Sequence, residues 1–259
     1  MPAVDVQVTK IHYEKKDAKT GGARAPIVFI HGSGGNAGMW RKLMGEMGSR
    51  TTLAIDLPGH GGSGGEGMRS IREYSAFVMS FLDALGLEKT VIAGHSMGGG
   101  VVLDFSLLFP ERLESIMLIG TGARLRVLPE ALEMNRKMAF GEMESEFTPW
   151  AFAENAPAEV IAEGKREWQK TGALVRYYDF VACDKFDIMS DVDKIQTPAL
   201  VVCGSEDRLT PVKYSEFLKR KIARAKMEVI PGSGHMVMME NPRALAGVIL
   251  EYLENEERT

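Results

Sequence analysis

The chain has 259 residues, of which 45% are hydrophobic and 25% charged, and its formal net charge is -4. This length and apolar content suffice for one large core, which excludes a disordered or fibrous protein and favours a single domain with an insertion. The basic residues are scattered along an acidic chain, so nucleic acid is not expected as a partner. No apolar run approaches the roughly 20 residues that span a bilayer, so no membrane-spanning helix is expected.

The cysteines and residues 1–16 indicate the cellular compartment in which the protein is expected. Cys183 and Cys203 lie in unlike sequence contexts, and each is expected to act as an ordinary apolar side chain. Residues 1–16 alternate valines with polar residues and lack the basic start and apolar stretch of a secretion signal. We therefore expect a reduced, cytoplasmic protein, either a monomer or a homodimer.

Short apolar runs alternate with amphipathic stretches along most of the chain. The apolar runs have the length of buried parallel strands, and the stretches between them have helical periodicity. The expected strands are residues 27–30, 53–55, 91–93, 116–119, 200–202 and 227–230, and the expected helices are residues 71–85, 101–109, 212–222 and 243–253. This alternation predicts an α/β fold with a mostly parallel, doubly wound sheet, to which the opening residues add an antiparallel edge.

One interval, residues 123–186, breaks this alternation. It holds helical patterns and most of the large aromatic residues, but no convincing strand. Because it leaves from the carboxyl edge of the sheet, where ligands bind in such folds, we expect an inserted helical cap over the site. The core domain would then consist of residues 1–122 and 187–259. Most of the cap aromatics are expected to form a small core of the cap itself, with one or two facing the site.

The pentapeptide Gly94–Gly98 reads Gly-His-Ser-Met-Gly and follows the apolar run 91–93. A serine on so tight a turn between a strand and a helix needs small residues on both sides, and the two glycines meet this need. The turn exposes the hydroxyl of Ser96 at the carboxyl edge of the sheet, beside the start of a helix. Ser96 is therefore the candidate nucleophile.

A serine hydroxyl is a poor nucleophile at neutral pH, so Ser96 needs a base and the base needs an orienting acid. His235 follows the last apolar run in a glycine-flanked turn, and Asp207 follows the preceding run, which places both at the edge that carries Ser96. Glu206 is the neighbouring rival for the acid; Asp207 is preferred because Pro211, which opens the following helix, leaves it in the loop. The four other histidines each have a structural interpretation: His12, His31, His60 and His95.

Acyl transfer also needs hydrogen-bond donors for an oxyanion. The amide of Met97, directly after the serine, is one candidate, and the amide of Ser33 in the glycine-rich loop 31–36 is the other. This loop lacks the G-x-G-x-x-G spacing and the Lys-Ser/Thr ending of phosphate-binding loops, so we do not expect it to bind phosphate. The segment 56–61 is interpreted as a structural turn in which Asp56 bonds nearby backbone.

Together these motifs resemble those of the α/β-hydrolase superfamily, and the resemblance spans nearly the whole chain. The motifs are the His31-Gly32 loop, the segment 56–61, the turn 94–99, the acid loop 204–211 and Gly234-His235. The resemblance implies that Ser96 attacks an acyl carbonyl, with His235 as base and then acid and Asp207 as its orienting group. It also implies an oxyanion hole from the amides of Ser33 and Met97. No metal and no organic cofactor are implied.

Members of this superfamily with a cap of this size include carboxylesterases, C–C bond hydrolases, enol-lactone hydrolases, haloperoxidase-like enzymes and hydroxynitrile lyases. Epoxide hydrolases and haloalkane dehalogenases have an aspartate at the position of Ser96, so these two activities are not expected. Plant hydroxynitrile lyases have a lysine at the position of Met236, so lyase activity is not expected either. We predict a carboxylesterase for small to medium acyl chains, with Gly32, Trp150 and Met236 in the substrate pocket. Two alternatives stay open. The loop Gly32–Gly35 favours a C–C bond or enol-lactone hydrolase of aromatic-degradation products, and a non-enzymatic small-molecule receptor is the other class.

Overall fold

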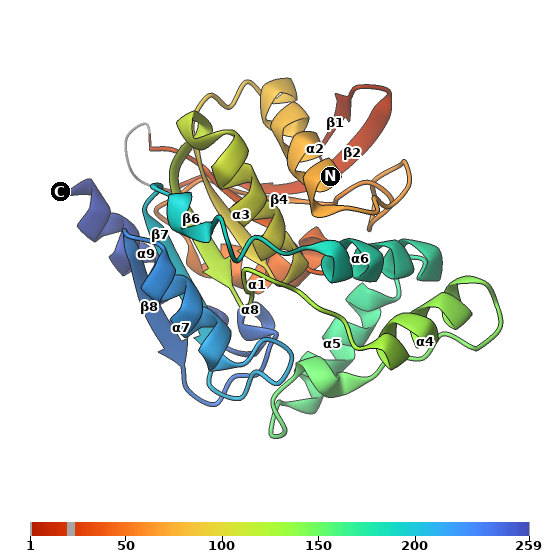
Figure 1. Cartoon of the computed structure of the whole chain (residues 1–259). Helices are drawn as coiled ribbons and strands as arrows, with labels where there is room; N and C mark the ends of the chain where they lie inside the picture. The colour runs from red at the N-terminus through yellow and green to blue at the C-terminus, as the bar shows by residue number, and fades with distance from the viewer. Residues whose placement is uncertain (1, 20–23, 259) are drawn as a thin grey trace.

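The computed structural model describes residues 2–19 and 24–258. Within these residues the strands are β1 (Ala3–Val6), β2 (Thr9–Lys16), β3 (Ile27–Ile30), β4 (Thr52–Ile55), β5 (Thr90–His95), β6 (Leu113–Ile119), β7 (Ala199–Gly204) and β8 (Ala225–Ile230). They form one eight-stranded sheet in the order β1-β2-β4-β3-β5-β6-β7-β8 (Figure 1). The pairs β1–β2 and β2–β4 are antiparallel, and all other neighbours are parallel. The predicted parallel sheet with an antiparallel edge is confirmed.

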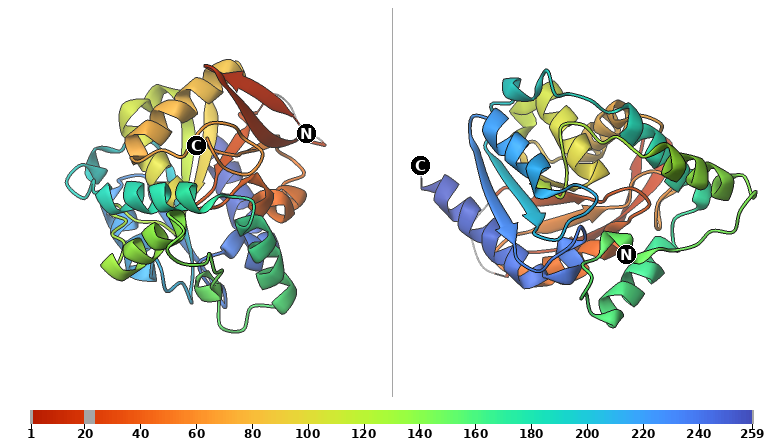
Figure 2. Two further views of the ribbon diagram at one scale, coloured as in Figure 1. Left: turned by 90° about the vertical axis from the view of Figure 1, so that its right-hand side faces the viewer. Right: turned by 60° about the horizontal axis from the view of Figure 1, so that its bottom comes forward.

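Helices cover both faces of this sheet. They are α1 (Arg41–Glu46), α2 (Ile71–Ala84), α3 (Met97–Leu108), α7 (Val212–Lys221), α8 (Val237–Glu240) and α9 (Pro242–Glu257). Four short 3-10 helices are η1 (Ala37–Trp40), η2 (Pro110–Arg112), η3 (Pro149–Ala151) and η4 (Val192–Lys194). Figure 2 shows the sheet between the two helical layers.

The two layers follow from the alternation of side chains along each strand. In β3, Val28 and Ile30 pack with α2 and α3, whereas Ile27 and Phe29 pack with α1, α8 and α9. All four side chains are buried, because a parallel strand in the middle of the sheet is covered on both faces. The core therefore consists of two hydrophobic layers, and polar chemistry is left to the loops at the strand ends.

Helix α3 begins earlier than its sequence pattern indicates. The apolar periodicity predicts a helix from residue 101, but the helix starts at Met97, directly after Ser96. The glycines of its first turn carry no apolar pattern, yet they allow the helix to approach the sheet. A Cβ on Gly98 would overlap with the carbonyl oxygen of Ile30. The candidate nucleophile thus lies at the N-terminus of a helix that is packed closely on β3.

The segment between β6 and β7, every residue of which is described, holds three α-helices besides η3 and η4, and no strand. These are α4 (Pro129–Ala139), α5 (Ala158–Trp168) and α6 (Ala173–Lys185), and they lie together at one end of the molecule (Figure 1). The chain enters and leaves this segment side by side: Arg124 and Asp187 form an antiparallel bridge. The amide of Leu125 also donates to the carbonyl of Phe186 at 3.3 Å. We call residues 123–186 the cap.

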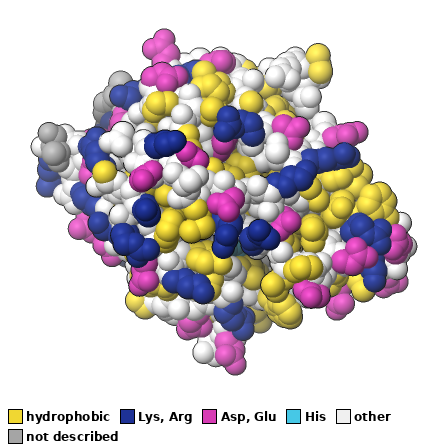
Figure 3. Space-filling model, in the orientation of Figure 1, with side chains coloured by type: hydrophobic (Ala, Val, Ile, Leu, Met, Phe, Trp, Pro, Cys, Tyr) yellow, Lys and Arg dark blue, Asp and Glu magenta, His cyan; other side chains and the backbone are white. Residues whose placement is uncertain are grey.

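The large cap side chains pack both with one another and on the core domain. Within the cap, the ring of Phe147 lies beside those of Phe152 and Trp168, and the ring of Phe140 lies beside that of Tyr177. Phe152 packs with the core on the α8–α9 face of the sheet, and Phe186 packs with the core on the α3 face. Phe140 and Trp150 are exposed to 59% and 71%. Hydrophobic side chains are correspondingly visible on the surface over the cap helices (Figure 3). The cap thus lies directly on the core domain, which buries Phe152 and Phe186 but leaves other apolar side chains of the cap exposed.

Two observations concern the cysteines and the membrane. Cys183 and Cys203 are free thiols, and both are buried. Among the described helices, none combines the length and the apolar character that a membrane-spanning segment requires.

Candidate active site

The turn between β5 and α3 holds Ser96 in a left-handed conformation, with φ 53° and ψ -116°. A residue with a Cβ is strained in this region, so the surrounding structure must hold it there. The amide of Ser96 donates to the carbonyl of Ile119 at 3.0 Å, and its carbonyl accepts from Thr121 Oγ1 at 2.8 Å. A Cβ on Gly94 would overlap with the carbonyl of Gly98. The small flanking residues are therefore a steric requirement of this turn.

His235 and Asp207 form a buried pair beside this turn. Nδ1 of His235 lies 2.8 Å from Oδ2 of Asp207, and both side chains are buried. The two residues follow β8 and β7, which are neighbours in the sheet. Glu206, by contrast, is exposed. The structure thus brings His235 together with Asp207 and not with the adjacent carboxylate.

Further hydrogen bonds keep Asp207 ionised. Its Oδ1 accepts from the amides of Leu209 at 2.9 Å and Thr210 at 2.8 Å, and its Oδ2 accepts from Thr210 Oγ1 at 2.8 Å. Burial alone raises the pKa of Asp207, but His235 and Thr210 outweigh it, so the pKa lies below its usual value. Because an ionised carboxylate only accepts, Nδ1 of His235 carries the proton. Nε2 of His235 is then available to accept a proton.

Ser96 and this pair lie next to the same short segment, which ends β6 at Ile119 and continues with Gly120. The amide of Ser96 is bonded to the residue before Gly120, and a Cβ on Gly120 would lie 3.3 Å from both Asp207 Oδ2 and His235 Nδ1. His95, directly before Ser96, donates from Nε2 to the carbonyl of His235 at 3.0 Å. Burial and the neighbouring His235 lower the pKa of His95 to about 3, so this ring is neutral. Among the described residues none bonds the hydroxyl of Ser96, a contact that often forms only with substrate bound.

The loop after β3, residues 32–38, passes beside Ser96, and we call it the glycine loop. A Cβ on Gly32 would lie 3.0 Å from the Cβ of Ser96. Met97 follows Ser96 as the first residue of α3. Neither the amide of Met97 nor that of Ser33 donates a hydrogen bond to another described residue. Both amides are thus free to donate to a ligand.

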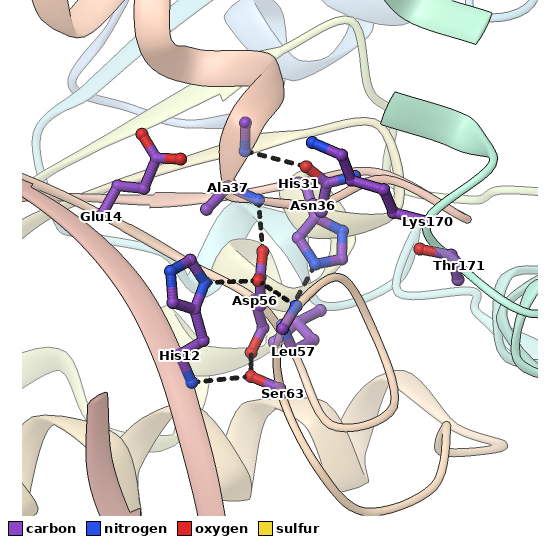
Figure 4. Close-up of polar contacts among 12 residues, drawn as sticks. His12, Glu14, His31, Asn36, Ala37, Asp56, Leu57, Ser63, Lys170 and Thr171 are labelled. Carbon is purple, nitrogen blue, oxygen red and sulfur yellow. Dashed lines mark hydrogen bonds and ion pairs between the residues drawn. The ribbon is translucent and has the colours of Figure 1, made fainter. Parts of the chain in front are cut away.

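Side chains of the core domain hold the glycine loop from one side (Figure 4). Asp56 accepts from the amide of Ala37 at 2.6 Å. Its other oxygen accepts from the amide of Gly62 at 2.7 Å, which is the bond to nearby backbone expected of a structural turn. His31 donates from Nδ1 to the carbonyl of Gly32 at 2.8 Å and accepts at Nε2 from the amide of Leu57 at 3.1 Å. Burial lowers the pKa of His31 to about 4, and the neutral ring is the form that makes both bonds.

The cap holds the glycine loop from the other side. Four hydrogen bonds join them. The amide of Gly34 donates to Asp179 Oδ2 at 2.7 Å, Thr171 Oγ1 to the carbonyl of Gly35 at 3.1 Å, and Asn36 Nδ2 to the carbonyl of Glu167 at 2.8 Å, while Ser33 Oγ and Cys183 Sγ share a hydrogen bond of 3.4 Å. Sequence reasoning missed Asp179, because it lies in a cap helix 145 residues from its partner and no local pattern marks it. The loop that carries one free amide is thus anchored on the core and on the cap.

The loop that carries His235 is also tied to the cap. The carboxylate of Glu240 accepts from three backbone amides: Ala153 at 2.9 Å, Gly234 at 3.0 Å and Met236 at 3.1 Å. The amide of His235 itself donates to the carbonyl of Ala151 in the cap at 2.9 Å. Sequence reasoning missed Glu240 as well. Its only local signal was a carboxylate five residues after the candidate base.

The residues predicted to line a substrate pocket lie in different surroundings. Gly32 lies against Ser96, Met236 is buried in the core on the α8–α9 face, and Trp150 is largely exposed in η3. Their contact with a substrate stays a prediction. In the part of the chain that the structure describes, no group of three or more His, Cys, Asp or Glu side chains is arranged to hold a metal ion.

The sheet is mostly parallel, a strained serine follows β5, and a buried His–Asp pair follows β7 and β8. This fold and this site together are typical of the hydrolase class of proteins. Residues 27–248 match the Alpha/beta hydrolase family, and the chain belongs to this family. The family and the fold expected from the motifs are therefore confirmed.

Known relatives of the chain differ in their reported activities. It is 31% identical over 245 residues to the dihydrolipoyllysine-residue acetyltransferase component of the acetoin cleaving system of Pseudomonas putida, covering 88% of this chain and 63% of that protein. The chain thus spans less than two thirds of the length of this relative. A solved thermophilic esterase is 34% identical, with a TM-score of 0.81 and coverage of 98% and 97%. The 2-hydroxymuconate semialdehyde hydrolase of Pseudomonas sp. strain CF600 is 27% identical, with coverage of 90% and 88%.

Proposed function

We propose that this protein hydrolyses carboxylic esters with small to medium acyl chains. The observation that carries the proposal is the strained turn at Ser96 together with the buried pair His235–Asp207, both of which lie next to the residues that end β6, Ile119 and Gly120. A nucleophile, a base and an orienting acid in this order are what acyl transfer to serine requires. The likeness to a thermophilic esterase at 34% identity supports the ester as substrate.

The reaction follows from the hydrogen-bond directions at the site. Nε2 of His235 takes the hydroxyl proton of Ser96 while Oγ attacks the ester carbonyl. The amides of Ser33 and Met97 donate to the oxyanion that develops. His235 then gives the proton to the departing alkoxide, which leaves an acyl-enzyme. Water, deprotonated by the same imidazole, attacks the acyl-enzyme and releases the carboxylic acid, and His235 returns the proton to Ser96.

The test is a rate series on nitrophenyl esters from acetate to octanoate. Ser96→Ala is expected to lower kcat/KM by about 10³- to 10⁶-fold. Ser80→Ala is the matched control, because Ser80 is half-buried on α2 and its hydroxyl bonds only the carbonyl of Ala76. A fluorophosphonate should label the wild type and Ser80→Ala but not Ser96→Ala. Absence of both ester turnover and labelling in the folded wild type would contradict the proposal.

A second candidate activity is hydrolysis of a C–C bond or an enol lactone. It is favoured by the glycine loop beside Ser96 and by the 27% identity to a 2-hydroxymuconate semialdehyde hydrolase. A higher kcat/KM for a ring-cleavage product or an enol lactone than for any ester, lost in Ser96→Ala, would replace the ester assignment. Labelling without turnover of any of these substrates, together with a large rise of Tm on ligand binding, would instead indicate a receptor.

A further inference from the structure

One face of α6 lies along the glycine loop. Arg176, Asp179 and Cys183 are spaced by three and four residues, so they share this face. A Cβ on Gly34 would lie 2.8 Å from Cγ of Arg176, and Sγ of Cys183 lies 3.4 Å from Oγ of Ser33. Asp179 lies between them, bonded to the amide of Gly34. A cap helix therefore contacts the loop at the residue that carries a predicted oxyanion donor.

The carboxylate of Asp179 is fully buried, yet it is completely bonded. Oδ2 accepts from the amide of Gly34 at 2.7 Å and from Nε2 of His60 at 2.8 Å. Oδ1 accepts from the hydroxyl of Tyr74 at 2.6 Å. A buried carboxylate costs several kcal/mol unless such donors surround it. Three donors from three separate segments converge on this carboxylate, so its place relative to the glycine loop is closely defined.

The bond from Gly34 controls the direction of the preceding peptide group. Gly34 has φ +66°, and the peptide that joins it to Ser33 is planar, so its N–H and the carbonyl of Ser33 turn together. While Asp179 holds this N–H, the peptide cannot rotate. Because this peptide follows Ser33 directly, fixing it narrows the orientations that are open to the Ser33 amide, in a loop whose Gly32 lies against Ser96. The Gly32–Ser33 peptide, which carries the Ser33 amide, is itself held at its carbonyl oxygen by Nδ1 of His31 at 2.8 Å and by the amide of Gly35 at 3.0 Å. Asp179 adds the constraint on the peptide that follows Ser33.

We propose that Asp179 is a positioning residue that aims the Ser33 amide at the oxyanion, so that docking of the cap completes the oxyanion hole. This inference rests on the proposed ester hydrolysis. Asp179 does not touch the reacting atoms and acts through Gly34. The side of the cap formed by α6 is then a fixed part of the catalytic apparatus, and a lid motion on this side would abolish oxyanion binding.

The test compares Asp179→Asn with Asp184→Asn. Asp184 is on the same helix and bonds the amide of Val127 at 3.2 Å, away from the glycine loop. For a nitrophenyl ester, Asp179→Asn is expected to lower kcat by about 10- to 100-fold with KM changed by less than about two-fold. Asp184→Asn should keep the wild-type kcat. A merely structural role would lower Tm without this split between kcat and KM.

The matched thionoester gives a second readout, because a thiocarbonyl sulfur accepts hydrogen bonds poorly and gains little from an oxyanion hole. The ratio of oxyester to thionoester rates should fall in Asp179→Asn and stay unchanged in Asp184→Asn. If Asp179→Asn does not fold, Thr171→Val replaces it. That variant removes the bond to the carbonyl of Gly35 on the same loop and should lower the ratio about 3- to 10-fold.

The outcomes separate the two proposals. A wild type that neither hydrolyses esters nor reacts with a fluorophosphonate contradicts the proposed function. An active wild type with unchanged kcat and rate ratio in folded Asp179→Asn overturns the role of Asp179. An equal loss on oxyester and thionoester also overturns it, since the carboxylate would then support the fold and not the oxyanion donor.

Discussion

Oδ2 of Asp207 lies 2.8 Å from Nδ1 of His235, whereas the carboxylate of Glu206, one residue earlier, is exposed to solvent. The turn after β7 causes this difference. The amides of Leu209 and Thr210 bond the carboxylate of Asp207 and draw it inward. Two adjacent acids of similar chemistry thus have different surroundings.

Substitution of these two acids tests which one orients the base. Asp207→Asn is expected to lower kcat/KM for esters by about 10²- to 10⁴-fold, because the amide favours the wrong tautomer of His235. Glu206→Gln should stay within about two-fold of the wild type, because its side chain is solvated. Steady-state kinetics on one nitrophenyl ester measures both. A comparable loss in Glu206→Gln would assign the orienting role to that residue.

The left-handed turn at Ser96 predicts stored backbone strain. Glycine adopts φ 53° without a Cβ penalty, whereas alanine keeps that penalty and loses only the hydroxyl. Ser96→Gly is therefore expected to be more stable than Ser96→Ala by about 1 kcal/mol, although both are inactive. Urea unfolding of the two variants under one condition measures the difference. An alanine variant that is equally or more stable would show that the turn is not strained.

The buried His60 predicts a pH dependence of stability. Its Nδ1 donates to the carbonyl of Pro58 at 3.0 Å and its Nε2 to Asp179. Burial alone would lower the pKa of His60, but Asp179 and these two hydrogen bonds raise it above the usual 6.5. The protonated ring is thus favoured in the folded state. Its stabilising contribution is complete below pH 6.5 and is lost as the pH rises through the raised value.

Thermal unfolding from about pH 6.5 to about pH 8 should therefore show a falling Tm that is less steep in His60→Gln. His31, whose ring lies 4.6 Å from that of His60, acts in the opposite sense, because its pKa is lowered to about 4 and only the unfolded chain binds its proton near pH 6.5. The comparison with His60→Gln therefore isolates the slope that is due to His60. Equal slopes in the wild type and His60→Gln would show that His60 is neutral in the folded protein.

Glu240 is expected to support both stability and activity. Its carboxylate bonds three amides that belong to the cap and to the loop of His235. Glu240→Ala leaves these amides without their acceptor and should lower the free energy of unfolding by about 1–3 kcal/mol. It should also lower kcat, because His235 loses its anchor. Glu251→Ala, on the exposed side of α9, is the control. Unchanged unfolding and turnover in Glu240→Ala would contradict this role.

Local sequence determined the core domain and the candidate triad. Buried parallel strands show as short apolar runs, and the carboxyl ends of such strands meet at one edge. Ser96, Asp207 and His235 each come shortly after such a run, so their approach could be predicted without coordinates. The glycines at the serine turn added a steric signal that is also local. The start of α3 was missed because glycines carry no periodicity, although the helix begins at Met97.

Only the tertiary structure decided how the cap is attached. Asp179 and Glu240 are ordinary acids in their helices, and their partners become apparent only when distant segments pack together. The cap aromatics show the same limit, since Phe152 and Phe186 pack against opposite faces of the core domain, which their sequence pattern does not indicate. Hydrophobic periodicity indicates that a face will be buried, but it does not identify the surface that covers it. That choice depends on shape and on hydrogen bonds between residues far apart in the chain.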